Sequence, residues 1–221
     1  MIILLFGPPG CGKGTQAAFL ADKLQIPAIS TGEMFRAECQ SGTALGRRAK
    51  ALLACGKLIG DDIVNEMVAS RTGATDCAGG FLLDGYPRTV RQAAYFSDLL
   101  RERDLPEPVV FHIDVPDELL VRRLGARRQC PNCHKIYNLL SQPPAVHGRC
   151  DGDGTALITR DDDQECIIRD RLRAYAEQTD PVLGYYGHSN VIRVDGTLPV
   201  SDVAAAIDEA LVRPLVRSSV G

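Results

Sequence analysis

The chain has 221 residues, of which 45% are hydrophobic and 24% are charged, a composition typical of an ordinary globular protein. It has no tryptophan, 5% aromatic residues and a formal net charge of −3, so neither a base-stacking platform nor a general polyanion-binding surface is expected. No apolar stretch approaches the roughly 20 residues of a membrane span, and the N-terminal MIILLF run lacks the basic residues of a signal peptide. We therefore expect a cytoplasmic protein that binds neither nucleic acid nor membrane.

Short apolar segments alternate along the chain with segments of helical pattern. The apolar segments predict strands over residues 2–6, 26–30, 81–84, 108–115 and 191–195. Helices are predicted over residues 13–24, from Ser30 onward, and over 43–54, 61–71, 89–104, 116–128, 162–186 with an interruption at Pro181, and 200–213. The strands lack an alternation of polar and apolar residues, which indicates an α/β fold with a parallel sheet covered by helices on both faces.

A glycine-rich segment, GPPGCGKGTQ, follows the first predicted strand at residues 7–16. It matches the phosphate-loop pattern G-x-x-x-x-G-K, although Gly14 stands where the strict pattern has Ser or Thr, and Thr15 comes next. Glycines let backbone N–H groups turn toward phosphate oxygens, Lys13 places a charge against the terminal phosphates, and the start of the following helix adds its dipole. The segment therefore predicts a phosphate site. Cys11 lies beside the charge of Lys13, so we expect an acidic thiol there.

The segment FLLDGYPR, at residues 81–88, carries a second candidate group. Asp84 ends a predicted buried strand at the edge of the sheet where ligands gather, and a carboxylate there can hold Mg²⁺ through water. A hydrolysing ATPase normally carries a further carboxylate that polarises the attacking water, but Gly85 occupies the next position. The sequence therefore favours phosphoryl transfer to a substrate over hydrolysis.

Residues 129–160 are rich in proline, glycine, cysteine and polar residues, and this stretch is too long for a simple loop. We interpret it as a small inserted domain. Two pairs of residues have the spacing of a structural zinc site: Cys130 and Cys133, then Cys150 and Asp153. His134 and His147 compete with Asp153 for the fourth position. Such a metal would supply folding free energy and would leave no position open for catalysis.

The chain resembles the adenylate kinases with a long lid in five segments: GPPGCGKGTQ, ISTGEMFR, GKLIGDD, FLLDGYPRT and DDDQECIIRDRL. The similarity runs from residue 1 to about residue 213 in order and with consistent spacing. It implies a P-loop core at 1–29, 60–125 and 164–221, a helical AMP-binding arm at 30–59 and a lid at 126–163. Long-lid members from some bacteria carry the same Cys, Cys, Cys, Asp set, which implies Zn²⁺ in the lid.

The resemblance also implies a reversible phosphoryl transfer from Mg-ATP to AMP that gives two ADP. The residues implied for ATP are Gly10, Cys11, Gly12, Lys13, Gly14, Thr15, Arg123, Arg127, Ile136, Tyr137 and Leu198. Those implied for AMP are Thr31, Arg36, Lys57, Leu58, Ile59, Gly85, Tyr86, Pro87, Arg88, Gln92, Arg160 and Arg171. The catalytic groups would be Lys13, Arg88, Arg123, Arg160 and Arg171.

The chemistry of these residue types agrees with the implied reaction. Arginine forks bind phosphate through paired hydrogen bonds and keep their charge, and Gln92 can offer a donor and an acceptor to a base edge. Arg128 is an equally plausible partner for ATP beside Arg127. We expect the lid and the arm to move inward on binding, because an open site would let water accept the phosphoryl group.

Two other functions remain open from the sequence. One is a nucleoside monophosphate kinase that acts on UMP, CMP or GMP. The other is a P-loop ATPase with a zinc ribbon that binds nucleic acid, which the acidic net charge, the lack of tryptophan and Gly85 disfavour. We expect a monomer, because no long exposed apolar stripe is evident.

Overall fold

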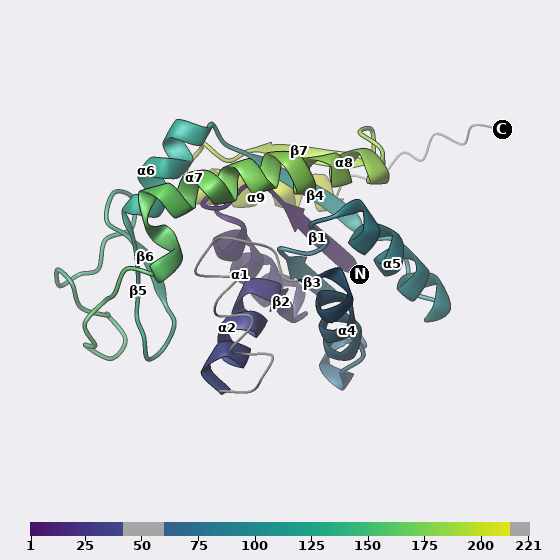
Figure 1. Ribbon diagram of the computed structural model, residues 1–221, viewed down its shortest axis with the longest axis horizontal. Coiled ribbons are helices and arrows are strands. Elements are labelled where there is room, and N and C mark those ends of the chain that lie inside the picture. Colours follow the sequence, from purple (N-terminus) through teal and green to yellow (C-terminus); the bar gives the residue numbers. More distant parts are fainter. Residues whose placement is uncertain (42–59, 213–221) are drawn as a thin grey trace.

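A five-stranded parallel sheet forms the centre of the computed structural model, which describes residues 1–41 and 60–212 (Figure 1). The strands lie side by side in the order β2 (Ala28–Ser30), β3 (Phe81–Asp84), β1 (Ile2–Phe6), β4 (Val109–Asp114) and β7 (Val191–Asp195). All five predicted strands are present, and β2 and β4 are shorter than predicted. Because every pairing is parallel, the carboxyl ends of all five strands meet at one edge, where α/β proteins bind their ligands.

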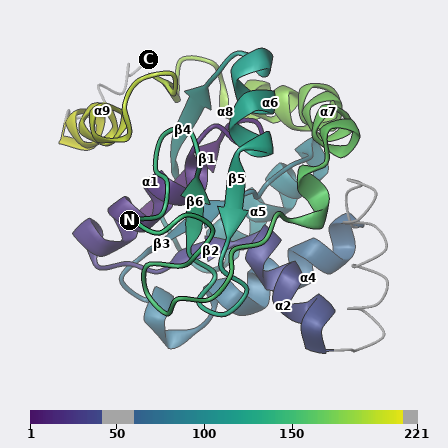
Figure 2. The ribbon, with the colours of Figure 1, turned by 90° about the vertical axis from the view of Figure 1, so that its left-hand side faces the viewer.

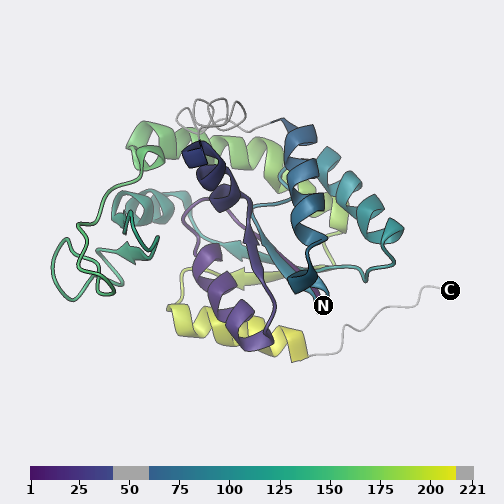
Figure 3. The same ribbon diagram turned by 90° about the horizontal axis from the view of Figure 1, so that it is seen from below.

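Helices cover both faces of this sheet, as the uninterrupted apolar strands predict. Residues Ile2, Leu4 and Phe6 of β1 belong to a core shared with α4 (Asp61–Thr72), α5 (Val90–Glu102) and α8 (Asp180–Tyr186). Ile3 and Leu5 face the other way, into a core shared with α1 (Lys13–Leu24) and α9 (Val200–Val212). Figure 3 shows α1 and α9 together on one side of the sheet and the other three helices on the opposite side. The P-loop α/β architecture is confirmed.

The segment predicted as one helix over 162–186 is divided differently in the structure. A short 3-10 turn, Asp161–Asp163, precedes α7 (Glu165–Ala174), and a π-helical turn, Tyr175–Thr179, separates α7 from α8. The interruption therefore lies before Pro181, which occupies the first turn of α8. A proline is accommodated there because the first N–H groups of a helix need no partner within the helix. The helix is interrupted instead at the wider π-helical turn that precedes it.

The predicted helix over 116–128 is too long. The helix α6 covers Asp117–Gly125, and the next residues form the strand β5 (Arg127–Gln129), which pairs antiparallel with β6 (Ile136–Asn138). Glycine is a poor helix former, and pairing with β6 satisfies the backbone of β5 outside any helix. The lid segment therefore begins with a strand of its own rather than with the end of α6. Figure 2 shows β5 and β6 in front of the central sheet.

The helix α2 (Thr31–Ser41) begins directly after Ser30, as predicted. The predicted helix over 43–54 lies outside the described residues, as do the remaining positions of the arm up to 59. Among the helices that the structure describes, none combines the length and the apolar character needed to cross a bilayer.

Candidate active site

A cavity of about 580 Å³ opens at the carboxyl edge of the sheet. Its volume lies in the range of about 300–1,000 Å³ that is usual for sites that bind small molecules. Its wall includes sixteen of the residues that the sequence nominated: Gly10, Cys11, Gly12, Lys13, Gly14, Thr15, Arg36, Asp84, Arg88, Arg123, Arg127, Ile136, Tyr137, Arg160, Arg171 and Leu198. Segments far apart in the chain therefore meet around one space: the phosphate loop, α2, the end of β3 with its following turn, α6, the lid, α7 and the loop after β7.

The glycine-rich loop between β1 and α1 has the backbone conformation that its sequence predicts. Gly10 and Gly12 have φ angles of 85° and 106°, a left-handed region that side chains disfavour, and Gly12 immediately precedes α1. The Lys13 ammonium donates hydrogen bonds to the carbonyl oxygens of Gly7 at 2.7 Å and Pro8 at 3.0 Å. Lys13 thus lies folded over its own loop, and a bound phosphate would compete with these two carbonyl groups for the ammonium.

The thiol of Cys11 does not behave as the sequence suggested. Cys11 is buried in a core that also contains Ile113 and Leu120, and its Sγ atom lies 3.7 Å from the Lys13 ammonium. Burial raises the pKa of the Cys11 thiol above its ordinary value, and the opposing effect of the Lys13 charge is smaller. The prediction of an acidic thiol is therefore wrong, and Cys11 acts as a small packing residue.

Hydrogen bonds fix the turn that follows β3 and Asp84. The carbonyl oxygen of Gly85 accepts from Thr31 Oγ1 and from Arg88 Nε, each at 2.8 Å. The side chain of Gln92 is buried, and both of its ends are bonded: Oε1 accepts from the Arg88 backbone at 2.7 Å, and Nε2 donates to Asp61 at 2.8 Å. Gln92 would have to exchange one of these bonds to contact a base.

Some of the residues nominated for AMP lie behind the cavity wall or outside the described part of the chain. Thr31, Gly85, Tyr86, Pro87 and Gln92 are described but do not line the cavity. The buried Tyr86 hydroxyl donates to Asn65 at 2.7 Å, so this residue anchors the wall. The nominated residues Lys57, Leu58 and Ile59 lie outside the described residues.

The guanidinium groups at the cavity affect one another electrostatically. Burial lowers the pKa of Arg88, and the positive charges of Arg171 and Arg36 lower it further. Burial, together with the charges of Arg127 and Arg36, lowers the pKa of Arg160 to about 9. These shifts arise because like charges have been brought together away from water. The cavity therefore has a concentrated positive potential that suits a ligand with several phosphate groups.

Two aspartates that the sequence analysis did not nominate hold part of this arginine cluster. The Asp163 carboxylate, with no exposed side-chain surface, accepts hydrogen bonds from Nε and Nη2 of Arg127. The Asp162 carboxylate forms an ion pair with Arg171 at 3.0 Å, and although burial opposes it, the charges of Arg171 and Arg127 lower the pKa of Asp162. The available signal was the run of three aspartates at 161–163, directly before an arginine-bearing helix.

The side of the cavity nearest the lid holds the remaining nominated residues. Arg123 donates to the carbonyl oxygen of Gly196 at 2.8 Å, and Ile136 and Leu198 present exposed apolar surface. Of the two neighbouring arginines, Arg127 lines the cavity, whereas Arg128 donates to the backbone carbonyl groups of Gly125 and Arg127. This side therefore combines apolar surface with positive charge, as a nucleotide requires.

A cluster of three thiols and a carboxylate lies within the lid, with ligand atoms all within 4.8 Å of one another: Cys130, Cys133, Cys150 and Asp153. The sulfur atoms of Cys133 and Cys150 are 3.5 Å apart, and the sulfur of Cys130 lies 3.4 Å from Asp153. Among the residues that the structure describes, neither His134 nor His147 belongs to this cluster. Three thiolates and one carboxylate fit a closed tetrahedral zinc site.

Hydrogen bonds favour the anionic forms of two of these four groups. The Tyr137 hydroxyl donates to the sulfur of Cys150 at 3.4 Å and lowers the pKa of that thiol. The Thr155 backbone N–H and the Asn132 side chain both donate to Asp153 and hold its pKa well below its usual range. Metal ligands must be deprotonated, and these bonds favour that form at Cys150 and Asp153.

Comparison with known proteins gives a consistent result over nearly the whole chain. The model of the adenylate kinase family matches residues 5–191. The chain is 47% identical over 212 residues to an adenylate kinase of Symbiobacterium thermophilum, an alignment that covers 96% of this chain and 98% of that protein. It is 44% identical to one from Oceanobacillus iheyensis over 96% and 99% of the two chains, and 43% identical to one from Thermosipho melanesiensis over 92% and 95%.

Proposed function

Because this chain belongs to the adenylate kinase family, it transfers a phosphoryl group reversibly from Mg-ATP to AMP to give two ADP, and we propose that the transfer takes place in the cavity at the carboxyl edge of the sheet. One observation carries this location. Six arginines and Lys13 line the same cavity, so that its positive potential complements the phosphate groups of two nucleotides.

We assign the donor side of the cavity to the phosphate loop and the lid. The backbone N–H groups of residues 10–15 and the Lys13 ammonium would bind the ATP phosphates, with Arg123 and Arg127 alongside them. Ile136, Tyr137 and Leu198 would border the nucleoside. Mg²⁺ accompanies ATP and neutralises phosphate charge, and Asp84 on the cavity wall would hold it through water.

The acceptor side would lie between α2, the turn after β3, and α7. Arg36, Arg88 and Arg171 line it, and their forks suit the AMP phosphate, while Arg160 faces the transferring group. Residues behind the cavity wall would support the AMP pocket, together with residues 57–59: Thr31, Gly85, Tyr86, Pro87 and Gln92. Phosphoryl transfer needs little covalent help, so holding both nucleotides in line and stabilising the developing charge would suffice.

The domain organisation belongs to the same proposal. Residues 1–29, 60–125 and 164–221 would form the core, 30–59 the AMP-binding arm and 126–163 the lid. The lid core that the structure describes contains only Cys130, Tyr137 and Cys150 as buried members, which supports a structural zinc ion held by the three cysteines and Asp153. Reduced zinc ligands also support a cytoplasmic location. We infer that the protein acts as a monomer.

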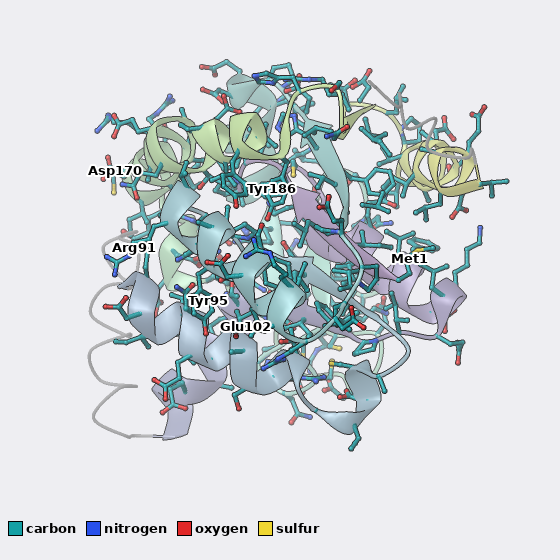
Figure 4. The ribbon with its side chains drawn as sticks, turned by 90° about the vertical axis from the view of Figure 1, so that its right-hand side faces the viewer. Met1, Arg91, Tyr95, Glu102, Asp170 and Tyr186 are labelled. Carbon is teal, nitrogen blue, oxygen red and sulfur yellow. The ribbon has the colours of Figure 1, made fainter. Side chains whose placement is uncertain are left out.

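The assignment of Arg88 to AMP is tested by a matched pair of substitutions. Arg88→Lys should lower kcat/KM for AMP by about 10²-fold, because lysine cannot reproduce the fork that binds a phosphate. The control is Arg91→Lys, since Arg91 lies at the outer surface in an exposed ion pair with Asp62 (Figure 4). Steady-state rates with varied AMP measure both variants. Equal values for the two variants would remove Arg88 from the acceptor site.

The zinc proposal predicts a metal content that depends on the four clustered residues. Wild-type protein, dialysed under reducing conditions, should contain about one zinc per chain, and Cys150→Ser should contain much less and unfold at a lower temperature. Cys166→Ser is the control, because Cys166 is exposed and lies outside the cluster. Elemental analysis and thermal unfolding give the two readouts. Retention of zinc by Cys150→Ser would contradict the assignment.

Closure of the cavity is tested by hydrogen exchange. A bisubstrate analogue in which two adenosines are joined through phosphates should slow exchange in residues 30–59 and 126–163, because both segments would close over it and exclude water. The sheet strands, already buried, should change little. Exchange that is the same in both segments with and without the analogue would argue against a closing lid and arm.

A further inference from the structure

Gln129 is a buried polar residue that no catalytic assignment above includes. It ends β5, is 8% exposed, and exchanges two backbone hydrogen bonds of 2.9 Å with Ile158. Its side-chain oxygen Oε1 accepts a hydrogen bond from Nε of Arg160 at 2.6 Å, and its Nε2 donates to the carbonyl oxygen of His134 at 3.2 Å. The amide is therefore held at both ends, which fixes where it presents its oxygen.

The bond to Gln129 determines which nitrogen atoms of Arg160 are left for a ligand. With Nε engaged, the terminal nitrogen Nη2 of Arg160 is buried and has no hydrogen-bond partner in the described part of the chain, although Arg160 lines the cavity. An unpaired guanidinium nitrogen away from water is costly, so this position favours an anionic oxygen from a ligand. A phosphoryl oxygen has the required charge and acceptor geometry.

A neutral partner distinguishes Arg160 from two of its neighbours. Arg127 and Arg171 bond to the carboxylates of Asp163 and Asp162, which cancel part of their charge. Gln129 orients Arg160 through an amide oxygen, so its direct partner carries no charge, and the carboxylates of Asp162 and Asp163 act on Arg160 only through space. For a group that must stabilise charge developing during transfer, an uncancelled and preoriented charge is the more useful arrangement.

The other end of the Gln129 amide connects this arrangement to the lid. His134 follows Cys133, and its backbone N–H donates to the carbonyl oxygen of Cys130 at 3.1 Å, so its carbonyl belongs to the turn that carries two of the clustered thiols. The chain from this turn through Gln129 to Arg160 consists of contiguous hydrogen bonds. Any ordering of the turn would therefore also order the guanidinium group.

We propose that Gln129 is a positioning residue for phosphoryl transfer, which holds Arg160 by Nε from a fixed point in the lid and presents its terminal nitrogens to the transferring group. This inference rests on the proposed role of Arg160. It adds a residue that touches neither nucleotide and acts only through the arginine.

The first test is Gln129→Met, which keeps the length of the side chain and removes both hydrogen bonds. We expect kcat to fall about tenfold while the KM values for ATP and AMP change less than about twofold, because a misplaced arginine weakens the transition state more than the bound substrates. Zinc content and the unfolding temperature should stay close to wild type. Gln164→Met is the matched control, because Gln164 is exposed before α7 and should leave kcat unchanged.

A double-mutant cycle with Arg160→Lys separates this inference from its premise. Arg160→Lys should be slow, and adding Gln129→Met to it should lower kcat by less than about twofold more, because the arginine through which Gln129 acts is gone. A wild-type kcat for Arg160→Lys would overturn the role of Arg160 and the inference with it. A slow Arg160→Lys beside a Gln129→Met with wild-type kcat would overturn the inference alone.

A purely structural role for Gln129 would be recognised by its effects on zinc content, on the unfolding temperature and on kcat in both backgrounds. If Gln129→Met lost zinc and melted early, or lowered kcat equally in both backgrounds, the positioning role would be wrong. If Gln129→Met failed to fold, Gln129→Glu decides, because it keeps an acceptor for Nε and adds a negative charge that competes with the phosphoryl group. We then expect a reduced kcat with unchanged KM, and a wild-type kcat would overturn the proposal.

Discussion

Mutual repulsion among half-buried arginines is the constraint around which the rest of the structure is arranged. Six guanidinium groups line one cavity, and burial together with neighbouring positive charge lowers the pKa of Arg88 and Arg160. Such a cluster costs folding free energy unless polar groups hold it in place. Backbone carbonyl groups orient Arg88 and Arg123 without cancelling their charge, and a carboxylate partly neutralises Arg127. The phosphates of two nucleotides would neutralise the excess positive charge.

The parallel sheet makes this concentration of charge possible. It places the phosphate loop, which follows β1, and Asp84, the last residue of β3, at one edge, and helices bury the strands from both faces. The lid is different, since its described core contains three buried residues, two of them cysteines of the thiol cluster. With so small a core, the lid would gain order from a metal bound at this cluster, and the hydrogen bonds of Gln129 connect the same cluster to Arg160.

Features that depend on local sequence were predictable. The glycines around Lys13 specify a loop conformation by themselves, and the paired spacing of the cysteines specifies a ligand set, so the amino-acid sequence alone locates both. The short strands were located for the same reason, since their apolar character marks them as buried.

Features that depend on tertiary packing were not predictable. Gln129 and Arg160 are 31 residues apart, so neither local segment predicts the hydrogen bond between them. The thiol of Cys11 was expected to be acidic from its neighbour in sequence, but the helices that bury it raise its pKa. Likewise, the break in the helix is a π-helical turn that lies before Pro181, whereas the sequence pattern marked only the proline.

The central claim is that positive groups fixed around the phosphates perform the catalysis, and Lys13 tests it most directly. The measurement is the rate of ADP formation from ATP and AMP by Lys13→Met, with Lys23→Met as the control, because Lys23 is exposed and pairs with Asp208 on α9. The account predicts a fall of about 10²–10³-fold for Lys13→Met, as for other groups that stabilise transition-state charge, and a wild-type rate for the control. Full activity of Lys13→Met would contradict it.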